Sequence, residues 1–135
     1  MFKYALWGEI IMSSQFDKHQ YGFTPDLEGA GIDPEKFYLA VYTNFRAKIE
    51  ELLRVSDFVT TRNPTWDFYV LKTSNGELKI SFIWERRTMK VKIIVDRRKE
   101  VEIYKKSLAQ MKESDASTYG EEIAVAAAQE AKNSS

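Results

Sequence analysis

The sequence from Trp66 to Val95 reads WDFYVLKTSNGELKISFIWERRTMKVKIIV, and this stretch decides the fold. It contains three runs in which large apolar residues recur at every second position, a pattern typical of β-strands with one buried face. Gly76 and the pair Arg86 and Arg87 separate the runs, where tight connections are expected. The segment therefore predicts a three-stranded antiparallel β-meander.

A register for this meander follows if residues 74–76 form a three-residue hairpin loop, so that Thr73 pairs with Glu77. The first hairpin then pairs Trp66 with Trp84, Phe68 with Phe82 and Val70 with Ile80. The second hairpin pairs Trp84 with Met89, Phe82 with Val91 and Ile80 with Ile93. A slip by one residue turns every side chain of a strand to the other face. We therefore predict that these apolar residues share one buried face.

Two amphipathic helices are expected to cover this face. Asp33, Pro34 and Glu35 are typical of a helix start, because Asp accepts hydrogen bonds from free amides and Pro is tolerated at the first position. A strong apolar stripe extends this helix to about Arg54. Apolar residues three and four apart predict a second helix within residues 97–114. The predicted fold class is α+β, a two-layer sandwich in which a meander of three to five strands packs against two helices.

The ends of the chain carry weaker patterns. Residues 2–12 are expected to form a strand, residues 13–32 a long irregular loop, and residues 56–61 a further short strand. Residues 115–135 are rich in alanine and have few large aliphatic side chains, so they are predicted to form a helical tail that either docks weakly or stays helical through propensity alone. We accordingly divide the chain into a single α+β domain over residues 1–114 and this tail.

Composition excludes several kinds of site. The chain has no cysteine and one histidine, His19, which rules out disulfides, thiolate metal sites and sites with several imidazoles. No cofactor or metal is expected. The apolar run near the N-terminus is too short to span a membrane, so we expect a cytoplasmic protein with no membrane partner.

Charge is uneven along the chain although the formal total is zero. Residues 62–106 contain twelve Lys and Arg against six Asp and Glu, and both flanking segments are acidic. Basic side chains on a sheet face with an exposed aromatic side chain are typical of nucleic-acid binding. The predicted binding residues are Tyr69, Lys79, Arg86, Arg87, Lys90, Lys92, Arg97, Arg98 and Lys99.

The predicted α-β-β-β-α order over residues 34–114 resembles a double-stranded-RNA-binding domain. Residues 97–99, Arg-Arg-Lys, stand where that family has a basic signature at the start of its last helix. The family's glycine-rich loop before that helix is missing here, so no residue role is carried over from the resemblance.

Asp67, Glu85 and Lys90 are candidate catalytic residues, because the register above places them close together near one hairpin end. Two carboxylates can hold Mg²⁺ and a lysine can help activate water. The arrangement resembles the PD-(D/E)xK nucleases, whose core is also a helix, a meander and a helix. The sequence departs from that pattern in that Arg87 follows Glu85 by two residues in place of lysine, and arginine cannot act as the base.

Three functions therefore stay open. The first is a non-catalytic protein that binds nucleic acid, or a protein of the nucleic-acid machinery, by analogy with viral or mobile-element accessory factors of the host cytoplasm. The second is a structural or inhibitory subunit that binds a protein partner through the long loop, residues 13–32, and the alanine-rich tail. The apolar residues Leu71, Ile83 and Ile94 on the predicted outer face also favour a protein partner. The third is the metal-dependent nuclease. The oligomeric state is left open.

Overall fold

The computed structural model describes residues 24–62, 66–74, 76–85 and 87–133, and within these it describes residues 61, 62, 66–68 and 85 by their backbone alone. The helices are α2 (Thr24–Gly29), α3 (Pro34–Leu52) and α4 (Ala116–Asn133), with two short 3₁₀-helices, η2 (Leu108–Gln110) and η3 (Glu113–Asp115), before α4. The strands are β1 (Val55–Arg62), β2 (Trp66–Thr73), β3 (Gly76–Glu85), β4 (Thr88–Val95) and β5 (Val101–Ser107).

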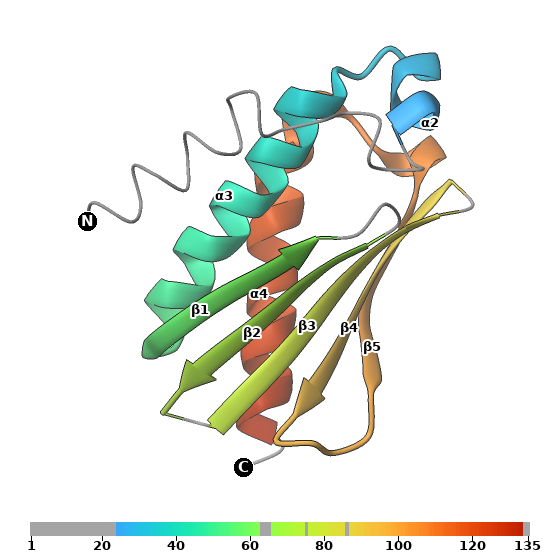
Figure 1. The fold of residues 1–135 in the computed structure, drawn as a ribbon. Helices are drawn as coiled ribbons and strands as arrows, with labels where there is room; N and C mark the ends of the chain where they lie inside the picture. The colour runs from blue at the N-terminus through green and yellow to red at the C-terminus, as the bar shows by residue number, and fades with distance from the viewer. Residues whose placement is uncertain (1–23, 63–65, 75, 86, 134–135) are drawn as a thin grey trace.

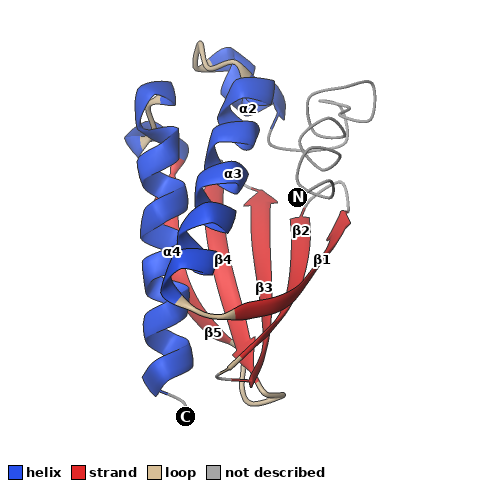
Figure 2. Cartoon of the chain, turned by 90° about the vertical axis from the view of Figure 1, so that its left-hand side faces the viewer, coloured by secondary structure: helices blue, strands red, loops and turns tan. Residues whose placement is uncertain are grey.

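The five strands form one antiparallel sheet in the order β1-β2-β3-β4-β5, which is a meander. Helices α3 and α4 both lie on one face of the sheet, behind it in Figure 1 and to its left in Figure 2. The predicted α+β class, with an antiparallel meander packed against helices, is confirmed. The strand predicted for residues 2–12 and the loop up to residue 23 lie outside the described residues. The end of that loop forms α2.

Helix α3 begins where the sequence predicts. The Asp33 side chain accepts hydrogen bonds from the backbone amides of Glu35 and Lys36 at 3.1 and 3.4 Å, and Pro34 is the first helical residue. The backbone amide of Asp33 donates to Glu113 in η3 at 2.8 Å. The cap of α3 is thereby joined to the segment that leads into α4.

The core between sheet and helices is aromatic at its centre. Trp84 of β3 is fully buried, and its indole Nε1 donates a 2.6 Å hydrogen bond to the hydroxyl of Tyr42 in α3. Tyr42 also meets Phe82 edge-on, with ring centroids 5.1 Å apart. Edge-on ring pairs are the favoured geometry for buried aromatics. These contacts fix how α3 sits on the strands.

The register of the second hairpin is confirmed. The observed pairs are Trp84 with Met89, Phe82 with Val91 and Ile80 with Ile93. All six side chains are buried.

The register of the first hairpin is wrong by one residue. Thr73 pairs with Gly76 and not with Glu77, so Tyr69 and Leu71 turn toward the helices and are buried. The observed pairs include Leu71 with Leu78, Tyr69 with Ile80, Phe68 with Ser81, Asp67 with Phe82 and Trp66 with Ile83. Strand β2 has apolar residues at both odd and even positions, so its pattern does not choose a face. The predicted register depended on a three-residue loop, residues 74–76. The observed connection between β2 and β3 is one residue shorter, which shifts the pairing by one residue.

Gly76 and Asp96 explain why this connection is tight. Gly76 has φ 112°, and an added Cβ would collide with the Asp96 carboxylate. That carboxylate accepts a 2.8 Å hydrogen bond from the backbone amide of Glu77, and the amide of Asp96 donates to the carbonyl of Glu77 at 2.8 Å. The turn after β4 therefore closes over the start of β3.

Strand β5 occupies the region predicted as the second helix. A bulge interrupts its pairing with β4, where Val91 pairs with Tyr104 but Lys92 pairs with Glu102. The extra residue lets Val101 and Tyr104, three positions apart, both pack against the core. A spacing of three is also what one face of a helix produces, so the period alone misassigned this segment.

Helix α4, not residues 97–114, supplies the second covering helix, and the expectation of weak docking is wrong. Its buried residues are Ala116, Tyr119, Gly120, Ile123, Ala124, Ala127, Ala128 and Ala131. A Cβ added to Gly120 would collide with the Val41 carbonyl and lie 2.9 Å from the Phe45 amide nitrogen. The backbones of α3 and α4 therefore approach closely, and small side chains are what permits this approach.

Candidate functional site

The outer face of the sheet, defined here as the face turned away from α3 and α4, is presented toward the viewer in Figure 1. Burial along β4 alternates at every residue, so Lys90 and Lys92 are half-exposed on this face between buried neighbours. Lys79 of β3 is half-exposed opposite Ile94. The three lysines predicted to share the outer face therefore do so.

Lys105 of β5 joins them, and sequence reasoning missed it because residues 97–114 were assigned to a helix. It lies directly opposite Lys90 in the antiparallel pairing. Like charges directly opposite one another destabilise a sheet. We call Lys79, Lys90, Lys92 and Lys105 the lysine cluster.

The lysine cluster has little compensating charge within the described part of the chain. Lys92 reaches the carboxylate of Glu100 at 4.0 Å, at the limit of an ion pair, and its cross-strand partner on β5 is Glu102. The ammonium groups of Lys79, Lys90 and Lys105 form no ion pair with any carboxylate whose side chain is described. An anion bound on this face would therefore meet ammonium groups that are not already neutralised.

Tyr69 does not belong to the outer face, which corrects the prediction of an exposed stacking residue. Its side chain is 1% exposed. Its ring lies 5.6 Å from that of Phe45 and 5.8 Å from that of Tyr42, both in α3. The one-residue shift of the first hairpin is the cause, and Tyr69 is a core residue.

The predicted arginines lie at the two ends of β4. Arg87 is exposed, with φ 56°, in the connection between β3 and β4. Arg97, Arg98 and Lys99 are exposed in the turn and loop between β4 and β5, not at the start of a helix. Arg86 lies outside the described residues.

The proposed alignment of Asp67, Glu85 and Lys90 does not hold in the backbone register. Asp67 pairs with Phe82, whereas Lys90 pairs with Ile83, whose partner on β2 is Trp66. Among the side chains that the structure describes, no group of three or more His, Asp or Glu is placed to hold a metal ion. The shift therefore removes the observation on which the nuclease hypothesis depended.

Aliphatic residues share the outer face with the lysine cluster. Val59 of β1 is 49% exposed and pairs with Val70 of β2, which is half-buried. Ile83 and Ile94 are half-buried on β3 and β4. Leu71, predicted to lie among them, is fully buried under the helices instead.

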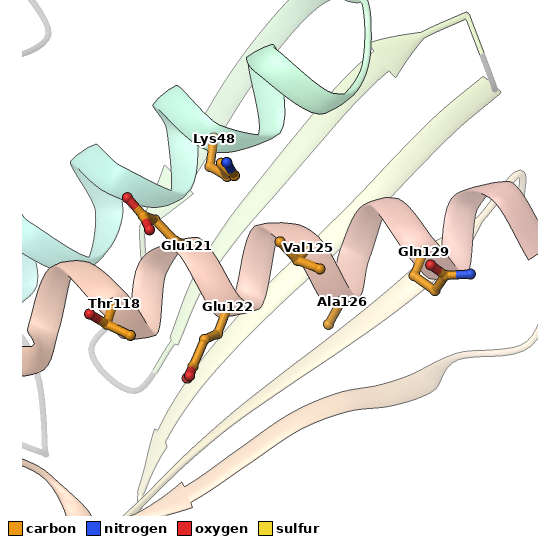
Figure 3. Close-up of a pocket in the computed structure, with 7 residues that line it drawn as sticks. All are labelled: Lys48, Thr118, Glu121, Glu122, Val125, Ala126 and Gln129. Carbon is orange, nitrogen blue, oxygen red and sulfur yellow. The ribbon is translucent and has the colours of Figure 1, made fainter.

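A groove of about 460 Å³ lies on the helix side of the molecule. Figure 3 shows its lining, which is Lys48 from α3 and Thr118, Glu121, Glu122, Val125, Ala126 and Gln129 from α4. Lys48 donates a 3.0 Å hydrogen bond to Glu51, and this bond raises the pKa of the lysine. Val125 is 49% exposed in this groove.

Strand β5 is joined to α4 by polar contacts. The hydroxyl of Tyr104 donates a 2.6 Å hydrogen bond to Glu122. Partial burial and this bond raise the pKa of Tyr104 well above its ordinary value. The ammonium of Lys106 lies 4.9 Å from the ring centroid of Tyr119, within cation–π range.

In comparisons with known proteins, no family model, curated protein or solved structure matches this chain. Within the described residues, no helix is both long and apolar enough to cross a membrane. Function must therefore be argued from the surfaces described above.

Proposed function

We propose that the outer face of the sheet binds the phosphate backbone of a nucleic acid and that the protein acts by binding. The observation that carries this proposal is the direct pairing of Lys90 with Lys105, on the face that also bears Lys92 and Lys79. Two ammonium groups held opposite each other cost stability in the free protein. A phosphate between them would turn this repulsion into two favourable charge-assisted contacts.

A polymeric anion suits this surface better than a small one. Basic residues follow β4 from Arg87 at one end to Arg97 at the other, a length of roughly 30 Å at the rise of a strand. The groove that the structure places beside α4 is on the opposite side of the molecule and is lined mainly by acidic and small residues. An extended row of cations that none of the described helices or strands encloses matches a chain of phosphates.

A second candidate, binding of a protein partner, is favoured by the groove between α3 and α4. Val125 is half exposed there beside Glu121 and Glu122. The alanine face of α4 itself is used in the core and is not free to bind a partner. A cytoplasmic location and a viral origin stay predictions under either function.

The test of nucleic-acid binding is fluorescence anisotropy with labelled DNA and RNA oligonucleotides over a series of salt concentrations. Replacing Lys90 and Lys105 together by Gln should weaken binding and flatten the slope of log K against log salt by about 1.5. The same change should leave thermal stability unchanged or raise it, because it removes a repulsive pair.

The matched control replaces Lys36 and Lys112 by Gln, which removes the same charge from exposed positions on α3 and before η3. It should change binding and its salt slope much less. Absence of binding at low salt, or an equal loss in the control, would contradict the proposal.

A further inference from the structure

The side chains on the outer face differ between its β1 edge and its β5 edge. On the β1 and β2 side, Val59 and Val70 form a directly opposed aliphatic pair. On the β4 and β5 side stand Lys90, Lys92 and Lys105. The central strand β3 lies between the two halves. Ile94 and Glu102 also lie on the β4 and β5 side, but that side carries three of the four lysines of the cluster, and the exposed aliphatic pair lies on the other. Each side is about two strands wide, roughly 5 Å per strand.

Lys72, the cation on the aliphatic side, has a carboxylate residue as its cross-strand partner on both sides. It pairs with Asp57 of β1 on one side and with Glu77 of β3 on the other. Opposite charges facing each other across strands stabilise a sheet. On the β4 and β5 half, Lys92 faces Glu102 in the same way, whereas Lys90 and Lys105 face each other, so the positive charge without a facing carboxylate is concentrated on that pair.

Resting on the proposed function, we infer that this face takes single-stranded nucleic acid, with its phosphates over the lysine cluster and its bases over Val59 and Val70. A single strand of nucleic acid also has two different edges, because its charged phosphates lie along one edge and its bases along the other. Its charge complements the cationic half, and its bases can cover the aliphatic half. The phosphate edge of a single strand therefore matches the cationic half of the outer face, and its base edge matches the aliphatic half.

A duplex fits this division less well. It presents phosphates on both of its outer edges and keeps its bases stacked inside. Laid on the outer face, it would bring charged phosphates against Val59 and Val70 and would desolvate them without an ionic partner. The lysine cluster alone would then bind the duplex, and only through its backbone charge.

The experiment compares a labelled single strand of about 16 nucleotides with a duplex of the same sequence, at one salt concentration and along a salt series. The test variant carries Val59→Thr and Val70→Thr, which keep side-chain shape and strand propensity. The control is Val125→Thr, because Val125 is as exposed as Val59 but lies on α4. Vesicles containing phosphatidylserine form a third arm.

We expect tighter binding of the single strand than of the duplex. The valine variant should lose roughly threefold to tenfold in single-strand affinity, with its salt slope and duplex affinity unchanged, and the control should lose nothing. Equal affinity for both forms, or a valine variant that binds the single strand normally, would overturn the inference and leave the proposed function standing. Binding to neither oligonucleotide would refute both, and vesicle binding in that case would assign the face to an anionic lipid surface.

Discussion

Replacing Gly120 by Ala tests whether α4 belongs to the core. Alanine is the better helix former by about 1 kcal/mol, so an exposed helix would gain that amount. Here the new Cβ would collide with the carbonyl of Val41 and lie 2.9 Å from the amide nitrogen of Phe45. Both obstacles are backbone atoms of α3, which cannot move aside as a flexible side chain can. The helices must therefore separate.

The expected loss of stability follows from the length of the contact between α3 and α4. A gap of 0.5–1 Å already forfeits about a quarter to a half of a dispersion contact, and it would open along the alanine face of α4. Overpacking of this kind costs about 1–3 kcal/mol. After the gain in helix propensity, we expect a net loss of roughly 1–2 kcal/mol, and a thermal midpoint lower by about 3–6 °C.

The assay is urea unfolding, followed by far-UV circular dichroism and by tryptophan fluorescence. Gly29→Ala is the control, because an added Cβ at Gly29 meets nothing within 4 Å. It should leave the midpoint unchanged or raise it slightly, because alanine has the higher helix propensity. If Gly120→Ala raised the free energy of unfolding by about 1 kcal/mol, as propensity alone predicts, the close approach of α3 and α4 would be refuted.

Three further changes test the packing around this core. Deleting residues 116–135 should abolish cooperative unfolding, which circular dichroism would show as the loss of a sharp transition; a truncated chain with an unchanged midpoint would contradict the burial of α4. Tyr42→Phe removes the acceptor of the Trp84 indole and should cost about 1–2 kcal/mol, measured by urea unfolding, and a cost near zero would argue against that bond. The raised pKa of Tyr104 means that the folded state holds its proton more tightly, so the stability from its bond to Glu122 is complete below about pH 10 and is lost as pH rises above that value. Tyr104→Phe should therefore lose stability less steeply than the unchanged chain in alkaline unfolding curves, and parallel curves would contradict this reasoning.

Sequence patterns predicted the fold class and the register of the second hairpin, because each of these patterns was compatible with only one structure. In β4, polar and apolar residues alternate from Thr88 to Ile93, so the apolar positions of this stretch select one face for burial. The cap of α3 was equally clear, because Asp33 and Pro34 have a single physical use at a helix start. Each of these predictions depended on a local pattern with one solution.

The failures arose where a local pattern had two solutions. Strand β2 is apolar on both faces, and only tertiary packing buries Tyr69. The bulge in β5 gives its core-facing residues the spacing of a helix face. The buried face of α4 consists mainly of small residues, so it can be recognised only from its close packing against α3. These errors changed the composition of the predicted site: Tyr69 is buried in the core, and Lys105 lies on the outer face where it was not predicted.

The position of α4 after the sheet in the chain has a consequence for synthesis. Each strand of the meander pairs with its neighbour in sequence, so the hairpins can form as they emerge, and local contacts of this kind form quickly. Helix α4 must return to α3, which was made long before. At about 5–20 residues per second, it is complete roughly 1–5 s after β5. In that interval the nascent sheet lacks half its cover, and this is when a chaperone would find the chain most exposed.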